Sequence, residues 1–279
     1  MAEKSIISNS KLNAIANAIK AKDSSATVPM TADQMAAAIA AIPAGGGGDN
    51  QIDKLVCMKS LPHYVCHEDT TVSEIKASAF QGITTLEDAD FSGVTGAAKI
   101  KVNSGAFRSC TALKHVLWPA GSDLLLKMDT FNGCTYLGDD TNGVVAGRFS
   151  EIGSSCFYSC THMTDFISTG GVQETPQLNV GGNAFQGCRN LKTVDLSLAP
   201  KFAYTGVFSS CIALEKLIIR DTTQVGIMSS SGAFSNCTPL TGKTARIYVP
   251  DALVEDYKAA TNWATYADII YGLSELPTT

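Results

Sequence analysis

The sequence predicts an α/β repeat fold: a solenoid of about seven turns that follows a small N-terminal helical segment and ends in a C-terminal helical cap. The main observation is a motif that occurs seven times: Phe, two residues, usually Cys, two residues, usually Leu. Its phenylalanines, 23 to 28 residues apart, are Phe80, Phe107, Phe131, Phe157, Phe185, Phe208 and Phe234. A fixed apolar signature at this period is typical of solenoids, in which each repeat buries its apolar edge against its neighbours.

Cysteine stands at the third position after Phe in six of the repeats, as Cys110, Cys134, Cys160, Cys188, Cys211 and Cys237. Because these cysteines recur in register, we expect them to stack as small apolar side chains inside the coil. Cys156 takes a position that alanine holds in several other repeats, which indicates a slot for a small residue. Only Cys57 and Cys66 lie outside the pattern. Buried reduced thiols are therefore favoured over a framework of disulfides.

Each repeat is predicted to contain a strand, a turn, an irregular or helical turn and a second strand. A large aliphatic residue stands five positions before Phe in five repeats, whereas Ala203 and Ser229 break this pattern. After the Leu position, apolar and polar residues alternate, which places Val116, Trp118, Val194, Leu196, Leu217 and Ile219 inside. Strands of successive repeats would then stack about 4.8 Å apart as a parallel sheet along one side. The third repeat departs most, because the polar stretch 137–143 occupies the place where a strand should begin.

The same alternation directs a second set of strand residues outward: Asp90, Leu117, Ile167, Asp195 and Ile218. Exposed Leu117, Ile167 and Ile218 on one sheet face would form an apolar strip, so these five positions are the candidate recognition face. Coverage of the strip by a neighbouring subunit or a loop is the alternative, and a multimeric assembly would combine both.

Residues 1–43 are predicted to form a separate helical segment for docking or oligomerisation. Leu12, Ile15 and Ile19 define one face of a helix over about 9–21, and Met35, Ile39 and Ile42 define one face of a second helix that ends at Pro43. Two helices of this size are too short to be stable alone, so we expect their apolar faces to meet each other and a partner. Residues 44–50 are a Gly-rich linker, and residues 51–249 hold the solenoid.

The C-terminal residues 250–279 are predicted to cap the last turn. A final strand over 246–250 leads into a helix over 251–260, with Leu253, Val254 and Tyr257 on one side. An apolar cluster follows, formed by Trp263, Tyr266, Ile269, Ile270, Tyr271 and Leu273. Because the terminal repeat of a solenoid exposes an open apolar face, this cluster is the natural cover for it.

Composition and motifs favour a binding protein over an enzyme. With 21 basic and 26 acidic residues the chain lacks the excess of positive charge typical of nucleic-acid binders. Its apolar runs are too short for membrane insertion, and we expect no secretory signal at the N-terminus. No phosphate-binding loop or nucleophile elbow is present, so no catalytic residue and no cofactor is expected. The cluster from His63 to His67 is a weak zinc candidate, and 139–143 lacks the acidic residue that would complete a calcium loop.

The repeat pattern Ala-Phe-x-x-Cys-x-x-Leu-x-x-Val-x-Leu resembles the bacterial-surface leucine-rich repeats of the BspA type, over about residues 72–250. The segment from Ile247 to Trp263 resembles the capping segment found at the C-termini of such arrays. The stretches 12–22 and 30–39 are similar to a short helical module near the start of tail-associated proteins of phages that infect gut bacteria. The resemblance implies a leucine-rich-repeat solenoid that adheres to host surfaces or other proteins.

Together these features predict a phage virion protein, a tail fibre or receptor-binding component that is made in the host cytoplasm. Its N-terminal helices would bind other virion proteins and form a homo-oligomer, with a trimer as one form. Its array would bind a host-surface protein or glycan. The alternatives are a bacterial cell-surface leucine-rich-repeat adhesin, which the expected lack of a secretory signal disfavours, and a capsid decoration or head fibre protein.

Overall fold

A computed structural model describes residues 62–66, 73–93, 98–139, 142–170, 177–202 and 204–277. The chain divides into two compact units, Met1–Pro62 and His63–Thr279. The predictions for the N-terminal helices, with Leu12, Ile15, Ile19, Met35, Ile39 and Ile42, and for the linker 44–50 lie outside the described residues. The same is true of Cys57 and His67.

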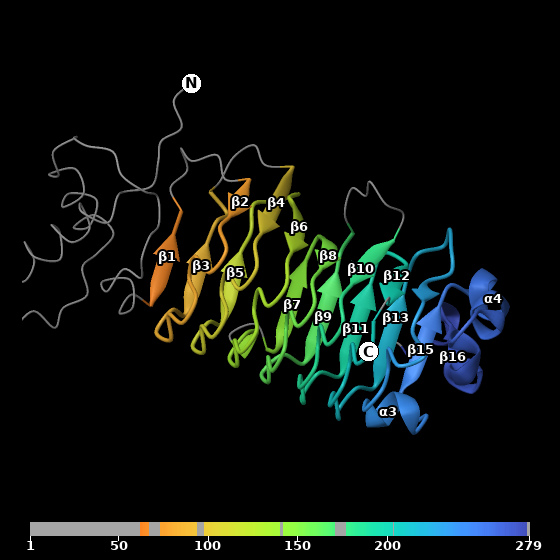
Figure 1. Cartoon of the computed structure of the whole chain (residues 1–279). Helices are drawn as coiled ribbons and strands as arrows, with labels where there is room; N and C mark the ends of the chain where they lie inside the picture. The colour runs from red at the N-terminus through yellow and green to blue at the C-terminus, as the bar shows by residue number, and fades with distance from the viewer. Residues whose placement is uncertain are drawn as a thin grey trace, which may run out of the picture. The chain divides into compact units, whose positions relative to one another are not determined.

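The second unit is a stack of short parallel strands that follows the repeat period, with two strands in most turns (Figure 1). Along one side run β1 (His63–Val65), β3 (Asp88–Asp90), β5 (His115–Leu117), β7 (Val144–Gly147), β9 (Asp165–Ser168), β11 (Thr193–Leu196), β13 (Lys216–Ile219), β15 (Arg246–Val249) and β16 (Ile270–Gly272). Along the other run β2 (Glu74–Ile75), β4 (Lys99–Val102), β6 (Asp123–Leu126), β8 (Phe149–Ile152), β10 (Leu178–Val180), β12 (Pro200–Phe202) and β14 (Ile227–Met228). The predicted solenoid is therefore confirmed, with a second parallel sheet in addition to the expected one.

In the first six repeats the Phe-x-x-Cys turn contains two left-handed residues, one two positions before Phe and one two positions after it, while the Phe234 turn has only the second, Asn236. Around Phe131 these are Asp129 (φ 58°) and Gly133 (φ 77°), and around Phe157 they are Ser155 (φ 53°) and Ser159 (φ 59°). Glycine, asparagine and aspartate adopt this conformation most readily, which explains why small polar residues and glycine recur there. The Phe amide also donates to the next turn, as from Phe131 N to Cys156 O at 2.8 Å, so the turns form a third ladder.

The core consists of a column of stacked phenylalanine rings beside a column of cysteines. Successive motif rings from Phe80 to Phe208 stack nearly in parallel, with centroids 4.9 to 5.5 Å apart. The motif cysteines are fully buried and free of disulfides, which confirms the expected reduced thiols. Their thiols also donate to a carbonyl of the preceding turn, as from Cys134 Sγ to Phe107 O at 3.0 Å and from Cys188 Sγ to Phe157 O at 3.0 Å. Cysteine therefore supplies a hydrogen bond as well as a small apolar volume.

Two irregularities of the sequence have structural counterparts. Ala203 and Ser229 break the aliphatic pattern, and in each case the preceding residue takes the core position. Phe202 pairs with the core residue Val180 of the turn before it, and Met228 pairs in turn with Phe202. The polar stretch 137–143 coincides with a break between the three-stranded sheet β1-β3-β5 and the six-stranded sheet that begins at β7. The seven-stranded sheet on the other side continues past this point, through β4, β6 and β8.

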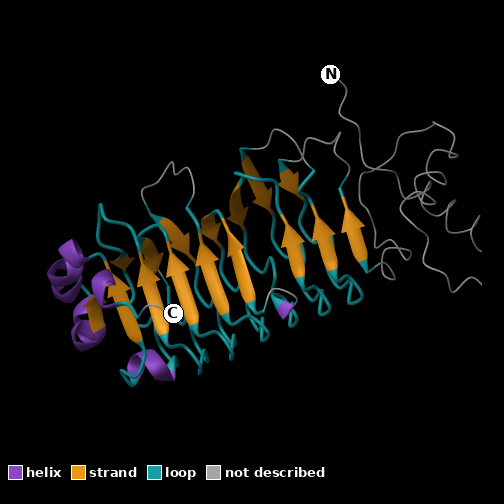
Figure 2. Cartoon of the chain, turned by 180° about the vertical axis from the view of Figure 1, so that it is seen from behind, coloured by secondary structure: helices purple, strands orange, loops and turns teal. Residues whose placement is uncertain are grey.

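The C-terminal segment covers the last turn, as predicted. It contains η3 (Asp251–Leu253), α4 (Val254–Ala259), η4 (Trp263–Ile269) and η5 (Leu273–Glu275), and α3 (Thr238–Thr241) precedes it in the last motif turn. Figure 2 shows these helices at one end of the stack of strands. Trp263 is fully buried against Phe234 and Phe202, and its Nε1 donates to Gly226 O at 2.7 Å. Strand β16, which sequence analysis did not predict as a strand, pairs with β15 and extends the sheet.

Candidate recognition face

Outward side chains of the strands on the β1 side line up in a row that is interrupted once, between β5 and β7. Strand register aligns Val65, Asp90 and Leu117 in the first sheet, and Ala146, Ile167, Asp195, Ile218 and Tyr248 in the second. We call these eight residues the outer row. Val65 is 56 % exposed and Leu117 is 45 % exposed, while Ile167 is half-buried. The structure thus brings all five residues predicted for this face into one row and adds Val65, which precedes the first motif.

The expected exposure of Ile218 is wrong, because this side chain is only 4 % exposed. It points outward but lies between Asp195 on one strand and Tyr248 on the next. Tyr248 is itself 1 % exposed, and η5 packs against its strand β15. The apolar strip therefore ends before β13, since the C-terminal cap extends onto this face of the sheet.

The two aspartates of the outer row have local partners. Asp195 accepts two hydrogen bonds from Arg220, from Nε and Nη2 at 2.7 Å each. Asp90 accepts a hydrogen bond from the backbone N–H of Ser92 at 2.8 Å. Both carboxylates are half-buried, so they border the apolar positions and hold the adjacent loops.

A polar row runs beside the outer row on the first sheet, and sequence analysis missed it. Strand register aligns His63, Asp88 and His115, and the Asp88 carboxylate contacts Nδ1 of both histidines, at 3.1 Å in the case of His115. The three residues are 25 and 27 positions apart, so the repeat period itself is the signal that could have aligned them. No group of three or more His, Cys, Asp or Glu able to hold a metal ion occurs among the described residues.

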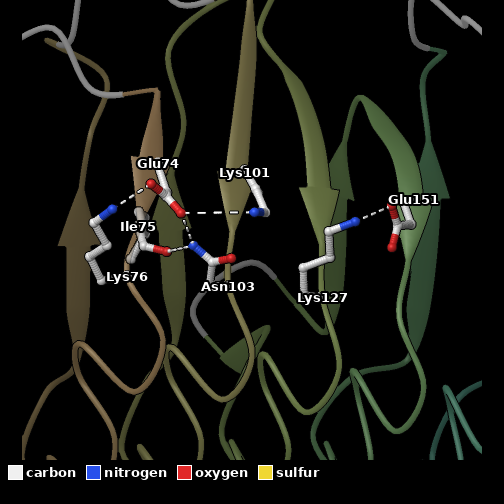
Figure 3. A network of polar contacts seen from close by, with 7 residues as sticks. All are labelled: Glu74, Ile75, Lys76, Lys101, Asn103, Lys127 and Glu151. Atoms are coloured by element: carbon white, nitrogen blue, oxygen red, sulfur yellow. Dashed lines mark hydrogen bonds and ion pairs between the residues drawn. The ribbon is translucent and has the colours of Figure 1, made fainter.

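The opposite sheet has an outer face of a different character. Figure 3 shows Glu74 beside Lys76, Lys101 and Asn103, and Lys127 facing Glu151. Hydrogen bonds from Lys76 and Asn103 lower the pKa of the Glu74 carboxyl below its ordinary value. Charges on this face are thus paired with one another along the stack. Exposed ion pairs of this kind contribute little free energy, and they offer no apolar area to a partner.

The break between β5 and β7 opens a cavity of about 270 Å³ on the recognition side of the solenoid. Leu117, Trp118, Pro119, Arg148 and Thr169 are among the residues that line it. Val116 and Trp118, which alternation placed inside, are half-buried here because β5 has no strand paired to this edge. This hollow therefore lies where β5 and β7 do not pair.

The buried thiols show no sign of nucleophilic activation. Burial raises the pKa of the Cys110 and Cys188 thiols to about 12 and that of Cys237 to about 11. A nucleophilic cysteine requires the opposite shift, toward the thiolate at neutral pH.

Among the described residues no helix is long and apolar enough to cross a membrane.

A two-sided parallel solenoid with this repeat defines the molecule as a leucine-rich-repeat protein. The family model described as "BspA type Leucine rich repeat region" matches residues 59–177 and 150–246, in six copies. The chain therefore belongs to the BspA-type leucine-rich-repeat family. A comparison with curated proteins finds no match.

Several solved structures are similar to the chain. The T. pallidum leucine-rich-repeat protein is 24 % identical with a TM-score of 0.48, over 70 % of this chain and 81 % of that one. A leucine-rich-repeat protein from Bacteroides ovatus is 18 % identical with a TM-score of 0.31, over 67 % of this chain and 63 % of that one. A leucine-rich cell surface protein from Faecalibacterium prausnitzii is 18 % identical with a TM-score of 0.30, over 64 % and 58 % of the two chains.

Proposed function

We propose that the protein is a non-catalytic attachment protein that binds a host-surface protein or glycan through the outer row and the cavity beside it. The observation that carries this proposal is the contrast between the two sheet faces. One presents exposed Val65 and Leu117 beside a cavity, whereas the other presents mainly charges that pair with each other, with a single exposed apolar residue of its strands, Ile227, at its far end. Exposed apolar groups rimmed by polar residues are typical of a surface that binds a partner.

In its finer form, the proposal is that the protein is a component of a phage virion, in a tail fibre or receptor-binding role. The N-terminal helical segment would then join the array to other virion proteins and to further copies of the chain. The resemblance of residues 12–39 to a tail-associated module supports this role, as does the division of the chain after Pro62. A bacterial cell-surface adhesin is the second candidate, and membership of the BspA-type family favours it.

Attachment through the outer row is tested with the double variant L117D/I167D of the full chain. Introducing two carboxylates into the apolar part of the row would remove its contact area and add charges that a partner would have to desolvate. We expect the fluorescently labelled variant to bind host cells at least tenfold more weakly than wild type. The measurement is a titration by flow cytometry against a panel of gut bacteria and cultured epithelial cells.

The matched control is the double variant K101A/E151A, which changes exposed Lys101 and half-buried Glu151 on the outer face of the opposite sheet. It should bind as wild type does, and circular dichroism should show the same folded spectrum for all three proteins. Unchanged cell binding by the L117D/I167D protein would refute attachment through this face. Binding to bacterial cells favours the virion role, while detection of the native protein in the envelope fraction of its own producing cell favours the adhesin.

A further inference from the structure

The cavity at the break has an aromatic wall that is held rigidly. The Trp118 ring stacks on the buried ring of Phe91, with centroids 5.6 Å apart and an interplanar angle of 12°. The ring is half-buried and lines the cavity together with Leu117 and Pro119. A fixed aromatic face next to aliphatic carbon offers apolar contact to a flat ligand at low entropic cost.

The polar side of the cavity carries the guanidinium of Arg148, whose positive charge is balanced by the carboxylate of Asp123. Arg148 Nε donates to Asp123 Oδ1 at 3.1 Å, and the Asp123 side chain is only 1 % exposed. The Arg148 side chain is 36 % exposed, so the rest of the guanidinium lies at the cavity wall. Arg220, by contrast, uses both Nε and Nη2 on one carboxylate, Asp195. Arg148 can therefore donate hydrogen bonds to a ligand without giving the site a net positive charge.

The remaining polar groups and the size of the cavity narrow the ligand class. The hydroxyl-bearing residues Ser122 and Thr169 also line the cavity. Its volume of about 270 Å³ lies just below the range of about 300–1,000 Å³ that is usual for drug-sized molecules. A small ligand with one apolar face and several hydroxyl groups matches this combination of ring, donors and hydroxyls. A strongly anionic ligand does not, because Asp123 neutralises Arg148.

We propose that this cavity binds a single uncharged pyranose ring of a surface glycan, with the sugar stacked on Trp118 and its hydroxyls hydrogen-bonded to Arg148 and Thr169. This inference rests on the proposed attachment function and assigns a ligand to one part of that face. In this proposal the break in the sheet creates the binding site. If β5 and β7 were paired, the space between them would be closed.

The test uses the full chain with neutral monosaccharides (glucose, galactose, mannose, N-acetylglucosamine) and with glucuronic acid as the charged comparison. The chain has two tryptophans, and Trp263 is fully buried in the cap, so a change in tryptophan fluorescence reports on Trp118. Saturation-transfer NMR measures binding independently of fluorescence. We expect at least one neutral sugar to change the emission and to bind at least tenfold more weakly to the W118A variant and several-fold more weakly to T169A.

The matched control is R220M, which removes an arginine of the same face that lies outside the cavity and should leave sugar binding unchanged. R148M leaves Asp123 without its arginine partner, so R148K is used beside it and folding of each variant is checked by circular dichroism. The proposal is overturned if no neutral sugar binds, if W118A binds as wild type does, or if glucuronic acid binds more tightly than every neutral sugar.

The test of sugar binding in the cavity can fail independently of the test of cell attachment. If W118A attaches to cells normally while L117D/I167D does not, the glycan assignment fails and attachment through the outer row stands. If the wild-type chain attaches to no cells, the attachment function fails whatever the sugar titrations give.

Discussion

At the scale of single residues, each buried motif cysteine except the last donates its thiol to the Phe carbonyl of the preceding turn, at distances of 2.9 to 3.3 Å. That carbonyl also accepts the backbone N–H of the residue three positions on, as from Cys134 N to Phe131 O at 3.0 Å, so the thiol is its second donor. Alanine would fit the volume of the slot less well and leave the carbonyl without this donor. Serine would donate, but its hydroxyl is costlier to bury in an apolar column.

The raised thiol pKa values predict that the folded protein loses stability at alkaline pH. Burial raises the pKa of Cys188 to about 12, whereas a thiol in the unfolded chain titrates near 8.5. The protonated folded state is therefore fully stabilised below about pH 8.5, and this contribution falls as pH rises toward 12. Each such thiol should cost about 2 kcal/mol between pH 8.5 and pH 10, at about 1.4 kcal/mol per pH unit.

Urea unfolding of wild type and of C188A at pH 8 and pH 10 measures this effect. The free energy of unfolding of C188A should fall less over this interval than that of wild type, by about 2 kcal/mol. Lysine and tyrosine titrate in both proteins, so the difference between the two isolates the thiol. Equal pH dependence of the two proteins would show that ionisation of this cysteine does not limit folding.

At the scale of elements, the sequence determines the turns more strictly than the strands. The Phe-x-x-Cys motif predicts every turn, because Phe, Cys and Leu each have one buried slot per repeat. The left-handed residues on both sides of Phe could have been predicted as well, since Ser, Asp, Asn and Gly recur there. The strands of two to four residues are less predictable. Their pairing depends on the length of the preceding loop, as the shift to Phe202 and Met228 shows.

The cap should stabilise the last turns of the array in particular. Trp263 closes the phenylalanine column and satisfies the carbonyl of Gly226, so W263A would leave a large cavity and lose a hydrogen bond. We expect a loss of about 3–5 kcal/mol of unfolding free energy. W263F keeps most of the packing and should lose about 1 kcal/mol, the usual contribution of one hydrogen bond.

Hydrogen exchange followed by mass spectrometry locates the effect. Because repeats are stabilised mainly by their neighbours, exchange in W263A should rise most in β13 and β15 and least in β3 and β5. A uniform rise along the array would contradict a local capping role, and would indicate that the array unfolds as one unit.

At the scale of the whole molecule, the alternation of residues predicted which strand side chains point outward, but not how far the exposed apolar positions extend. Alternation within each strand predicted the outward direction of Asp90, Leu117, Ile167, Asp195 and Ile218. Burial of Ile218 could not be read from its own repeat, because Tyr248 and the cap segment that shield it come from later in the chain. The cavity was missed for a similar reason. The insertion 137–143 was evident as a departure from the period, but the hollow also requires Arg148 and Thr169 from the following turns.

The N-terminal segment is expected to control assembly independently of the array. A chain that begins at Asn50 should keep the solenoid and become monomeric, because it lacks the residues predicted to form the apolar helix faces: Leu12, Ile15, Ile19, Met35, Ile39 and Ile42. Light scattering coupled to size exclusion measures the mass, and the full-length variant I15D/I39D tests the same faces without truncation. Oligomers of unchanged size in both proteins, or incorporation of the shortened chain into particles, would refute docking through these helices.

The interruption between β5 and β7 also gives the array an uneven bending stiffness. Most adjacent turns are joined by two strand ladders and the ladder of turns, but at this junction the β5 side has no strand ladder. The turns are joined there by β4–β6, by turn bonds such as Phe107 N to Thr130 O at 2.9 Å, and by the backbone bond from Gly138 N to Lys114 O at 2.6 Å. The phenylalanine column is unbroken there, with Phe107 and Phe131 at 5.2 Å. Load applied across the recognition side would therefore concentrate at one joint, where the stack flexes about its intact side. We therefore expect the two sheets of that side, β1-β3-β5 and the strands from β7 onward, to tilt relative to each other more readily than neighbouring turns within either sheet.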